Sequence, residues 1–98
     1  MTNMPALKKG LRVVQKMRGR TLSPERFGAF LETLFENGYI NVNGSVNPII
    51  NYMDYKAWHQ IEEFENPSTH EKVVIEFIKE WTHGHISYYV KDVEVSWE

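Results

Sequence analysis

The sequence contains no cysteine and no long apolar run, and each absence removes a class of protein. Without cysteine there is no disulfide framework, no thiolate nucleophile and no cysteine-ligated zinc. No fully apolar run exceeds four residues, far short of the ~20 that a membrane-spanning helix needs. The first residues are polar and basic and lack the apolar core of a secretory signal. We therefore expect a cytoplasmic protein that makes no membrane contact.

Motifs of catalysis and cofactor binding are also absent. The six glycines are isolated, so no glycine-rich loop can cradle a phosphate. No serine stands in a GxSxG context, and the histidines show neither HExxH nor another recognised ligand spacing. The acidic cluster of Glu62, Glu63 and Glu65 is typical of a solvated face rather than of a paired acid and base. The sequence predicts a non-enzymatic protein with no catalytic residue, cofactor or metal ligand.

The composition is that of one globular domain, residues 1–98. Hydrophobic residues make up 42% of the chain and aromatic residues 13%, which is too apolar for a disordered segment. A chain of this length can bury one modest hydrophobic core.

Residues 24–37 carry the clearest helix pattern. Ser23 is a good N-cap, and Pro24 suits the first helical position, where a missing N–H costs nothing. Gly38 fits a left-handed stop at the other end. Between them apolar residues recur every three or four positions on one face, namely Phe27, Phe30, Leu31, Leu34 and Phe35.

Periodicity predicts three further helices. Residues 5–18 combine an apolar stripe with a basic opposite side. Residues 48–64 and 68–82 each follow an asparagine–proline pair, which is a typical helix start, and continue with apolar spacings of three and four. The segment 73–82 opens with a β-branched run, so a strand there stays an alternative.

Two β elements complete the predicted fold. Residues 39–47 alternate apolar and polar around Asn43-Gly44, a pair that strongly favours a tight hairpin turn. Residues 85–97 alternate as a strand that changes parity near Lys91, which indicates a bulge. The predicted fold is α+β, with about four helices beside a small antiparallel sheet. Its core is predicted to comprise Leu11, Val14, Phe27, Phe30, Leu31, Leu34, Ile50, Met53, Ile61, Val74, Phe77, Ile78 and Trp81.

Charge is distributed unevenly along the chain. Before Phe27 the basic residues are opposed only by Glu25, which gives a charge of about +6, whereas the remainder carries about −8. This asymmetry indicates either contact with nucleic acid or attraction between the two parts within one fold. The candidate nucleic-acid contacts are Lys8, Lys9, Arg12, Lys16, Arg18, Arg20 and Arg26.

The order of a basic helix, a short turn, a second helix and a hairpin suggests a helix-turn-helix followed by a wing. A nucleic-acid-binding regulator is therefore the alternative function. Against it, the exposed side of the helix at 24–37 carries Glu32 and Glu36, which a phosphate backbone would repel.

The leading hypothesis is a small protein-binding module. Large amphipathic rings are more numerous than a core of this size needs, and Trp and Tyr are enriched at interface hot spots. Such a protein suits an adaptor, an inhibitor or an accessory factor of a mobile element or phage, with self-association as a homodimer as one form. The predicted partner-binding residues, placed on helical spacing and on the last strand, are Tyr52, Tyr55, Trp58, His59 and Tyr88.

Overall fold

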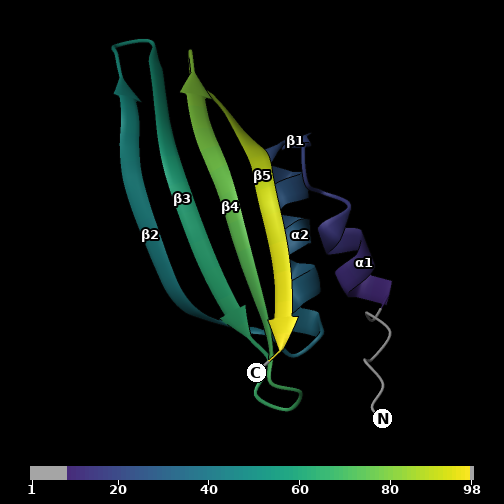
Figure 1. Ribbon diagram of the computed structural model, residues 1–98. Helices are drawn as coiled ribbons and strands as arrows, with labels where there is room; N and C mark the ends of the chain where they lie inside the picture. Colours follow the sequence, from purple (N-terminus) through teal and green to yellow (C-terminus); the bar gives the residue numbers. More distant parts are fainter. Residues whose placement is uncertain (1–8, 98) are drawn as a thin grey trace.

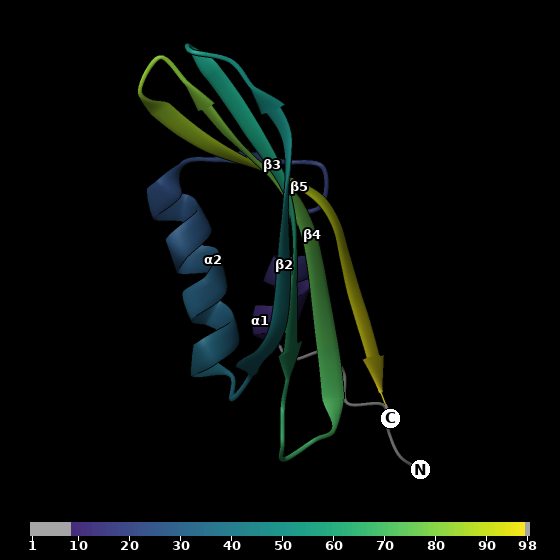
Figure 2. The same ribbon diagram turned by 90° about the vertical axis from the view of Figure 1, so that its left-hand side faces the viewer.

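The computed structural model describes residues 9–97 and consists of a five-stranded antiparallel sheet with two helices on one face (Figure 1 and Figure 2). The molecule is elongated, with principal extents of 54 × 21 × 19 Å. Its elements in chain order are α1 (Lys9–Gln15), β1 (Thr21–Leu22), α2 (Pro24–Glu36), β2 (Ile40–Asn51), β3 (Tyr55–Glu65), β4 (Glu71–Thr82) and β5 (His85–Trp97).

The sheet has the strand order β1-β5-β4-β3-β2. Strands β2 to β5 follow one another as an up-and-down meander, and the two-residue strand β1 pairs with Tyr88 and Tyr89 of β5. This order places β2 at one edge of the sheet. The helices lie toward the opposite edge of the sheet, where α1 and α2 both pack against β5.

Helix α2 confirms the sequence prediction for residues 24–37. Ser23 is the N-cap, because its Oγ accepts a hydrogen bond of 3.2 Å from the Arg26 N–H. Pro24 occupies the first helical position, and Gly38 follows the helix with φ of 90°, a conformation that favours glycine. Its apolar face contacts the sheet through Phe27, which stacks on Tyr88 at 4.1 Å between ring centroids.

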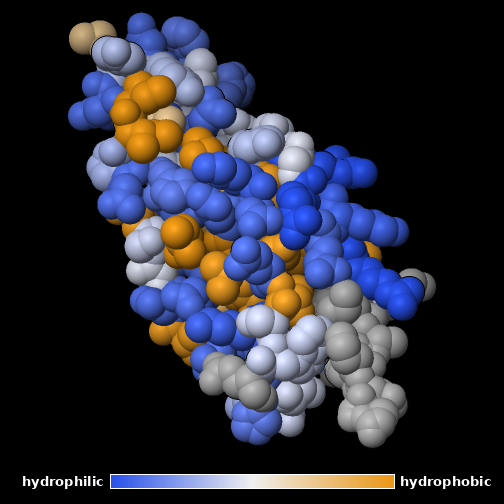
Figure 3. Space-filling model, viewed as in Figure 1, coloured by the Kyte–Doolittle hydropathy of each residue, from blue (hydrophilic) through white to orange (hydrophobic). Residues whose placement is uncertain are grey.

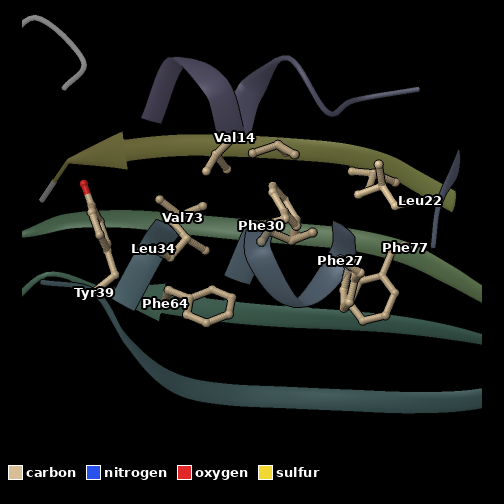
Figure 4. Close-up of a cluster of buried hydrophobic side chains, with 12 residues drawn as sticks. Val14, Leu22, Phe27, Phe30, Leu34, Tyr39, Phe64, Val73 and Phe77 are labelled. Atoms are coloured by element: carbon tan, nitrogen blue, oxygen red, sulfur yellow. The ribbon is translucent and has the colours of Figure 1, made fainter. Parts of the chain in front are cut away.

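The hydrophobic core fills the layer between the helices and the sheet (Figure 4). In β4 every second residue from Glu71 to Phe77 is buried, as expected for a strand with one covered face. Bulky apolar side chains converge there from six elements and from the α2–β2 connection. The buried residues of this cluster are Val14, Leu22, Phe27, Phe30, Leu34, Tyr39, Phe64, Val73, Ile75, Phe77, Val90 and Val93.

The predicted α+β fold with four helices is wrong, because residues 48–64 and 68–82 form strands. Residues 48–64 comprise the end of β2 and nearly all of β3, and 68–82 contain β4, which settles the alternative for 73–82 in favour of a strand. The misleading signal has a physical origin. The sheet face without helices, called the open face here, also carries half-buried apolar residues such as Ile61, Val74 and Ile78. With apolar residues at both parities, spacings of three and four arise in a strand.

The predicted hairpin at 39–47 is also wrong. Asn43 and Gly44 lie inside β2, paired with Glu63 and Glu62, and the true turn follows Asn51. The first helix is shorter than predicted, since α1 ends at Gln15 and residues 5–8 lie outside the described part of the chain. The C-terminal strand is confirmed as β5, and the register shift opposite Glu76 and Phe77 places its bulge at Lys91.

The predicted core is confirmed in part. Val14, Phe27, Phe30, Leu34 and Phe77 are buried, and Leu31 packs against the same cluster. Met53 is wrong, because its side chain is 88% exposed in the β2–β3 turn. The remaining predicted residues are only half-buried: Ile50, Ile61, Val74, Ile78 and Trp81. The side chain of Leu11 lies outside the described part of the structure.

The open face is mainly hydrophilic, with separate apolar patches over the strands (Figure 3). Within residues 9–97, neither helix is long or apolar enough to cross a membrane.

Candidate protein-binding surface

Strand β2 is an exposed edge with an unusual composition. Eleven of its twelve residues are exposed, and within residues 9–97 it pairs with β3 alone. The fourteen residues from Ile40 to Met53, called the edge segment here, include no charged side chain. An edge strand offers unpaired N–H and C=O groups to any extended chain, and natural edges are commonly protected by lysine or other charges. The edge segment lacks that protection.

The exposed hydrophobic side chains gather on the same segment. Among the described residues ten large hydrophobic side chains are exposed, and six of these lie in the edge segment. Tyr52 and Met53, in the turn, are the most exposed at 71% and 88%. Figure 3 shows an apolar patch at the upper end of β2 and β3, close to this turn. The six residues are Ile40, Val42, Val46, Ile49, Tyr52 and Met53.

Two β-bulges divide β2 into segments. The register with β3 shifts between Asn41 and Asn43, and again between Pro48 and Ile50. Val42 and Ile49 are therefore the extra residues, and Asn43–Pro48 is a straight stretch of six between them.

Side chains of β3 hold the start of this stretch in place. Asn43 Nδ2 donates to Glu63 Oε2 at 3.1 Å, and the Gly44 N–H donates to Asn43 Oδ1 at 2.9 Å. A Cβ at position 44 would lie 2.0 Å from Glu62 Oε2, so a larger residue there would require the end of the Glu62 side chain to move. The conformation of the edge is therefore built by β2 and β3 together.

The five predicted partner-binding residues do not form one surface. Tyr52 lies in the edge segment, where it is exposed. Tyr55 and His59 lie on the open face, where the Tyr55 hydroxyl donates to Glu80 Oε2 at 2.8 Å and His59 Nε2 lies 2.6 Å from Glu76 Oε2. Trp58 and Tyr88 lie on the helix side. The helical spacing that grouped Tyr52, Tyr55, Trp58 and His59 does not exist, because Tyr52 lies in a turn and the other three lie in β3.

Trp58 and Tyr88 flank a lysine. Lys79 Nζ lies 5.7 Å from the Trp58 ring centroid and 5.9 Å from that of Tyr88. One position further out, Lys56 Nζ lies 5.7 Å from the Trp81 ring. Tyr88 of this lysine–aromatic cluster is covered on one face by Phe27 of α2, whereas the strands themselves extend beyond the N-terminal end of that helix (Figure 2).

A cleft of about 330 Å³ runs from this cluster under the edge of α2. Its walls include Phe35, Gln60 and Glu62. Glu62 Oε2 is buried without a hydrogen-bond partner, and burial raises the pKa of the Glu62 carboxyl above its ordinary value. The cleft is thus mostly apolar, with one acidic group at its base.

The predicted nucleic-acid residues fall around α1 and the start of α2. Arg18 is tied to the sheet, because its Nε lies 2.8 Å from Asp92 Oδ1 and its guanidinium donates to the Val93 carbonyl. Arg12, Lys16, Arg20 and Arg26 are exposed. Lys8 lies outside the described residues, and so does the side chain of Lys9. The helix-turn-helix and wing arrangement is wrong, since α2 packs on the sheet and the expected wing is part of β2.

Sequence reasoning missed the edge segment, although a signal for it was present. Fourteen consecutive residues without charge stand out in a chain that is 24% charged. Nothing in the pattern, however, placed this stretch at a sheet edge.

Between residues 9 and 97 no three acidic or histidine side chains are grouped as metal ligands would be.

These features define a small sheet-dominated protein with helices on one face and an exposed edge strand without charged residues. The chain matches no protein family model, and no curated protein and no solved structure is significantly similar to it.

Proposed function

We propose that this is a non-enzymatic, cytoplasmic protein-binding module that captures its partner through the edge segment. One observation carries the proposal: the edge segment bears six of the ten exposed large hydrophobic side chains of the described residues and no charge. Backbone groups on such an edge supply affinity by adding a strand, and alternate side chains supply specificity. An adaptor, an inhibitor or an accessory factor would act in this way.

The experiment compares two matched lysine substitutions in affinity capture from a cell extract. Val46→Lys places a charge on the edge segment, whereas Val13→Lys places it on α1, and both valines are exposed, at 54% and 43%. Proteins captured by the wild type should be lost with Val46→Lys and kept with Val13→Lys. Loss with Val13→Lys alone, or equal capture by all three chains, would contradict the proposal.

A second function is favoured by the lysine–aromatic cluster. Single-stranded nucleic acid binds to surfaces where bases stack on aromatic rings beside lysine, and Trp58 with Lys79 has that arrangement. This site differs from the basic residues around α1. Binding of an oligothymidine to the full chain should weaken steeply as salt rises. Weakening by Trp58→Ala but not by Arg12→Ala would support the sheet site, and an absence of binding at low salt would exclude it.

A further inference from the structure

We infer that the partner of the edge segment is a second copy of this chain, joined by antiparallel pairing of β2 with β2 about a two-fold axis. The inference rests on the proposed function and names its partner. It would extend the sheet from five strands to ten across the two chains.

The first argument is charge. In a two-fold antiparallel pair the residue at the axis faces itself, and residues on either side of it face each other across the axis. Like charges opposite each other on paired strands are destabilising. A strand without charge avoids such pairs in every register, and the edge segment is uncharged over fourteen residues in a chain with 24 charged ones.

The second argument is the symmetry of the straight stretch Asn43–Pro48. The bulges at Val42 and Ile49 frame it on both sides. Its residues on the open face are Asn43, Ser45 and Asn47, which lie opposite Glu63, Ile61 and His59 of β3. With Ser45 facing Ser45 of the second copy, each Asn43 faces an Asn47. The three open-face positions are then self-complementary, with amide opposite amide and hydroxyl opposite hydroxyl.

The third argument concerns the backbone. Alternate residues of an edge strand direct N–H and C=O groups outward. Pro48 has no N–H, and the Gly44 N–H donates to Asn43 Oδ1 rather than to β3. These two residues have the same parity along β2, so we assign the outward-directed N–H and C=O groups to residues of that parity. In the Ser45-centred register Gly44 faces Val46, so the Val46 N–H of each copy can donate to the Gly44 carbonyl of the other, while the Gly44 N–H keeps its bond to Asn43 Oδ1. Pro48, which cannot donate, is not part of this central Gly44–Val46 pair.

Both bulge residues add an apolar contact to this register. Val42 and Ile49 are 45% and 54% exposed, and pairing brings Val42 of one copy near Ile49 of the other at each end of the stretch. The helices do not obstruct the arrangement, because they pack against β5, toward the edge of the sheet opposite β2.

Sedimentation velocity of the full chain from about 1 µM to about 300 µM tests the inference. The wild type should form a dimer within this range. Ser45→Lys puts two like charges at the axis and should raise the dimer dissociation constant at least about tenfold. The control is Ser96→Lys, an exposed serine on the same face of β5, which should dimerise as the wild type does.

A mixture makes the test specific for the register. Ser45→Lys and Ser45→Glu should each be monomeric alone and should pair when mixed, because the two-fold axis places residue 45 opposite itself. Dimerisation of both single variants at wild-type strength, or its loss in Ser96→Lys instead, would overturn the inference.

A cysteine readout does not depend on the stability of the charged variants. The chain has no cysteine, so Ser45→Cys introduces one thiol. Residues opposite each other in a non-hydrogen-bonded antiparallel pair have Cα atoms about 4.5 Å apart, which suits a disulfide. Under mild oxidation Ser45→Cys should cross-link rapidly and Ser96→Cys slowly, whereas equal rates would contradict the pairing.

The two proposals can fail separately. A wild-type chain that stays monomeric at about 300 µM removes the second copy as partner. If that chain still captures another protein in a manner lost with Val46→Lys, the edge segment remains a binding surface for a different partner. If neither association is observed, both proposals are wrong.

Discussion

Two adjacent glutamates show how closely the strand alternation controls chemistry at the residue scale. Glu62 faces the helix side, where its Oε2 is buried without a partner and burial raises its pKa. Glu63 faces the open face, where hydrogen bonds from Lys72 and Asn43 lower its pKa below the ordinary value. Folding therefore disfavours the ionised form of Glu62 and favours the ionised form of Glu63.

The two glutamines that replace them should change stability with opposite sign. Glu62→Gln should raise the free energy of unfolding at pH 7, by up to about 1 kcal/mol, because it removes a buried unpaired charge. Glu63→Gln should lower it, since its ion pair is lost. The raised pKa of Glu62 makes its ionised form a cost that appears as pH rises through the acid range. The lowered pKa of Glu63 gives a stabilisation that is present above the unfolded-state pKa and is lost as pH falls.

Urea unfolding from pH 3 to pH 7 measures both effects. At pH 3, below the unfolded-state pKa of both groups, the difference between Glu62→Gln and wild type should disappear, and that for Glu63→Gln should shrink. A Glu62→Gln variant that is less stable than wild type at pH 7 would show that the carboxylate has a partner.

Tyr39 is a second residue whose polar group is buried without compensation. Its side chain is 1% exposed, and its hydroxyl lies near Glu71 and Asn66 without a hydrogen bond of good geometry to either. Burial, together with the nearby Glu71 carboxylate, raises the pKa of the hydroxyl far above its ordinary value. Tyr39→Phe should leave the melting temperature unchanged or raise it, since removing an unpaired buried hydroxyl relieves a desolvation cost. A loss of more than about 1 kcal/mol would instead indicate a hydrogen bond to Glu71.

At the scale of elements, α2 is the part that sequence reasoning predicted best. Its signals all lie within the helix or next to it in the sequence: a capping serine, a proline at the first position, a single apolar face and a glycine after the end. The strands were missed because their signal is not local. An open face with Ile61, Val74 and Ile78 gives β3 and β4 apolar residues at both parities, and only the neighbouring strands show which parity is covered.

The N-cap of α2 can be tested against a serine without that role. Ser23→Ala removes the acceptor for the Arg26 N–H and should lower the free energy of unfolding by about 1 kcal/mol. Ser68→Ala is the control, because Ser68 is an exposed residue of the β3–β4 turn. Thermal unfolding should show a lower melting temperature for Ser23→Ala only. Equal effects would mean that the cap contributes nothing.

At the scale of the whole molecule, the basic first quarter and the acidic sheet are in direct contact. Arg18, in the turn after α1, reaches both the Asp92 carboxylate and the Val93 carbonyl of β5. Contact between the two charge classes within one fold therefore accounts for part of the asymmetry in the sequence. It leaves the exposed Arg12 without an assigned role.

This contact predicts different results for two arginines. Arg18→Ala should lower the free energy of unfolding by about 1 kcal/mol, because it removes a backbone hydrogen bond and an ion pair. Arg12→Ala should change it by less than about 0.5 kcal/mol, as is usual for an exposed surface position. Chemical denaturation measures both, and an equal loss for the two variants would show that Arg18 does not join α1 to the sheet.

The edge segment matters at all three scales, because its residues carry no charge, they form an exposed edge strand, and that strand leaves one edge of the sheet available for pairing. Hydrogen–deuterium exchange of the wild-type chain at about 5 µM and about 300 µM tests this most directly. We predict that amides between Ile40 and Met53 gain protection at the higher concentration while those of β5 do not change. Protection gained in β5 or α2 but not in the edge segment would contradict the account.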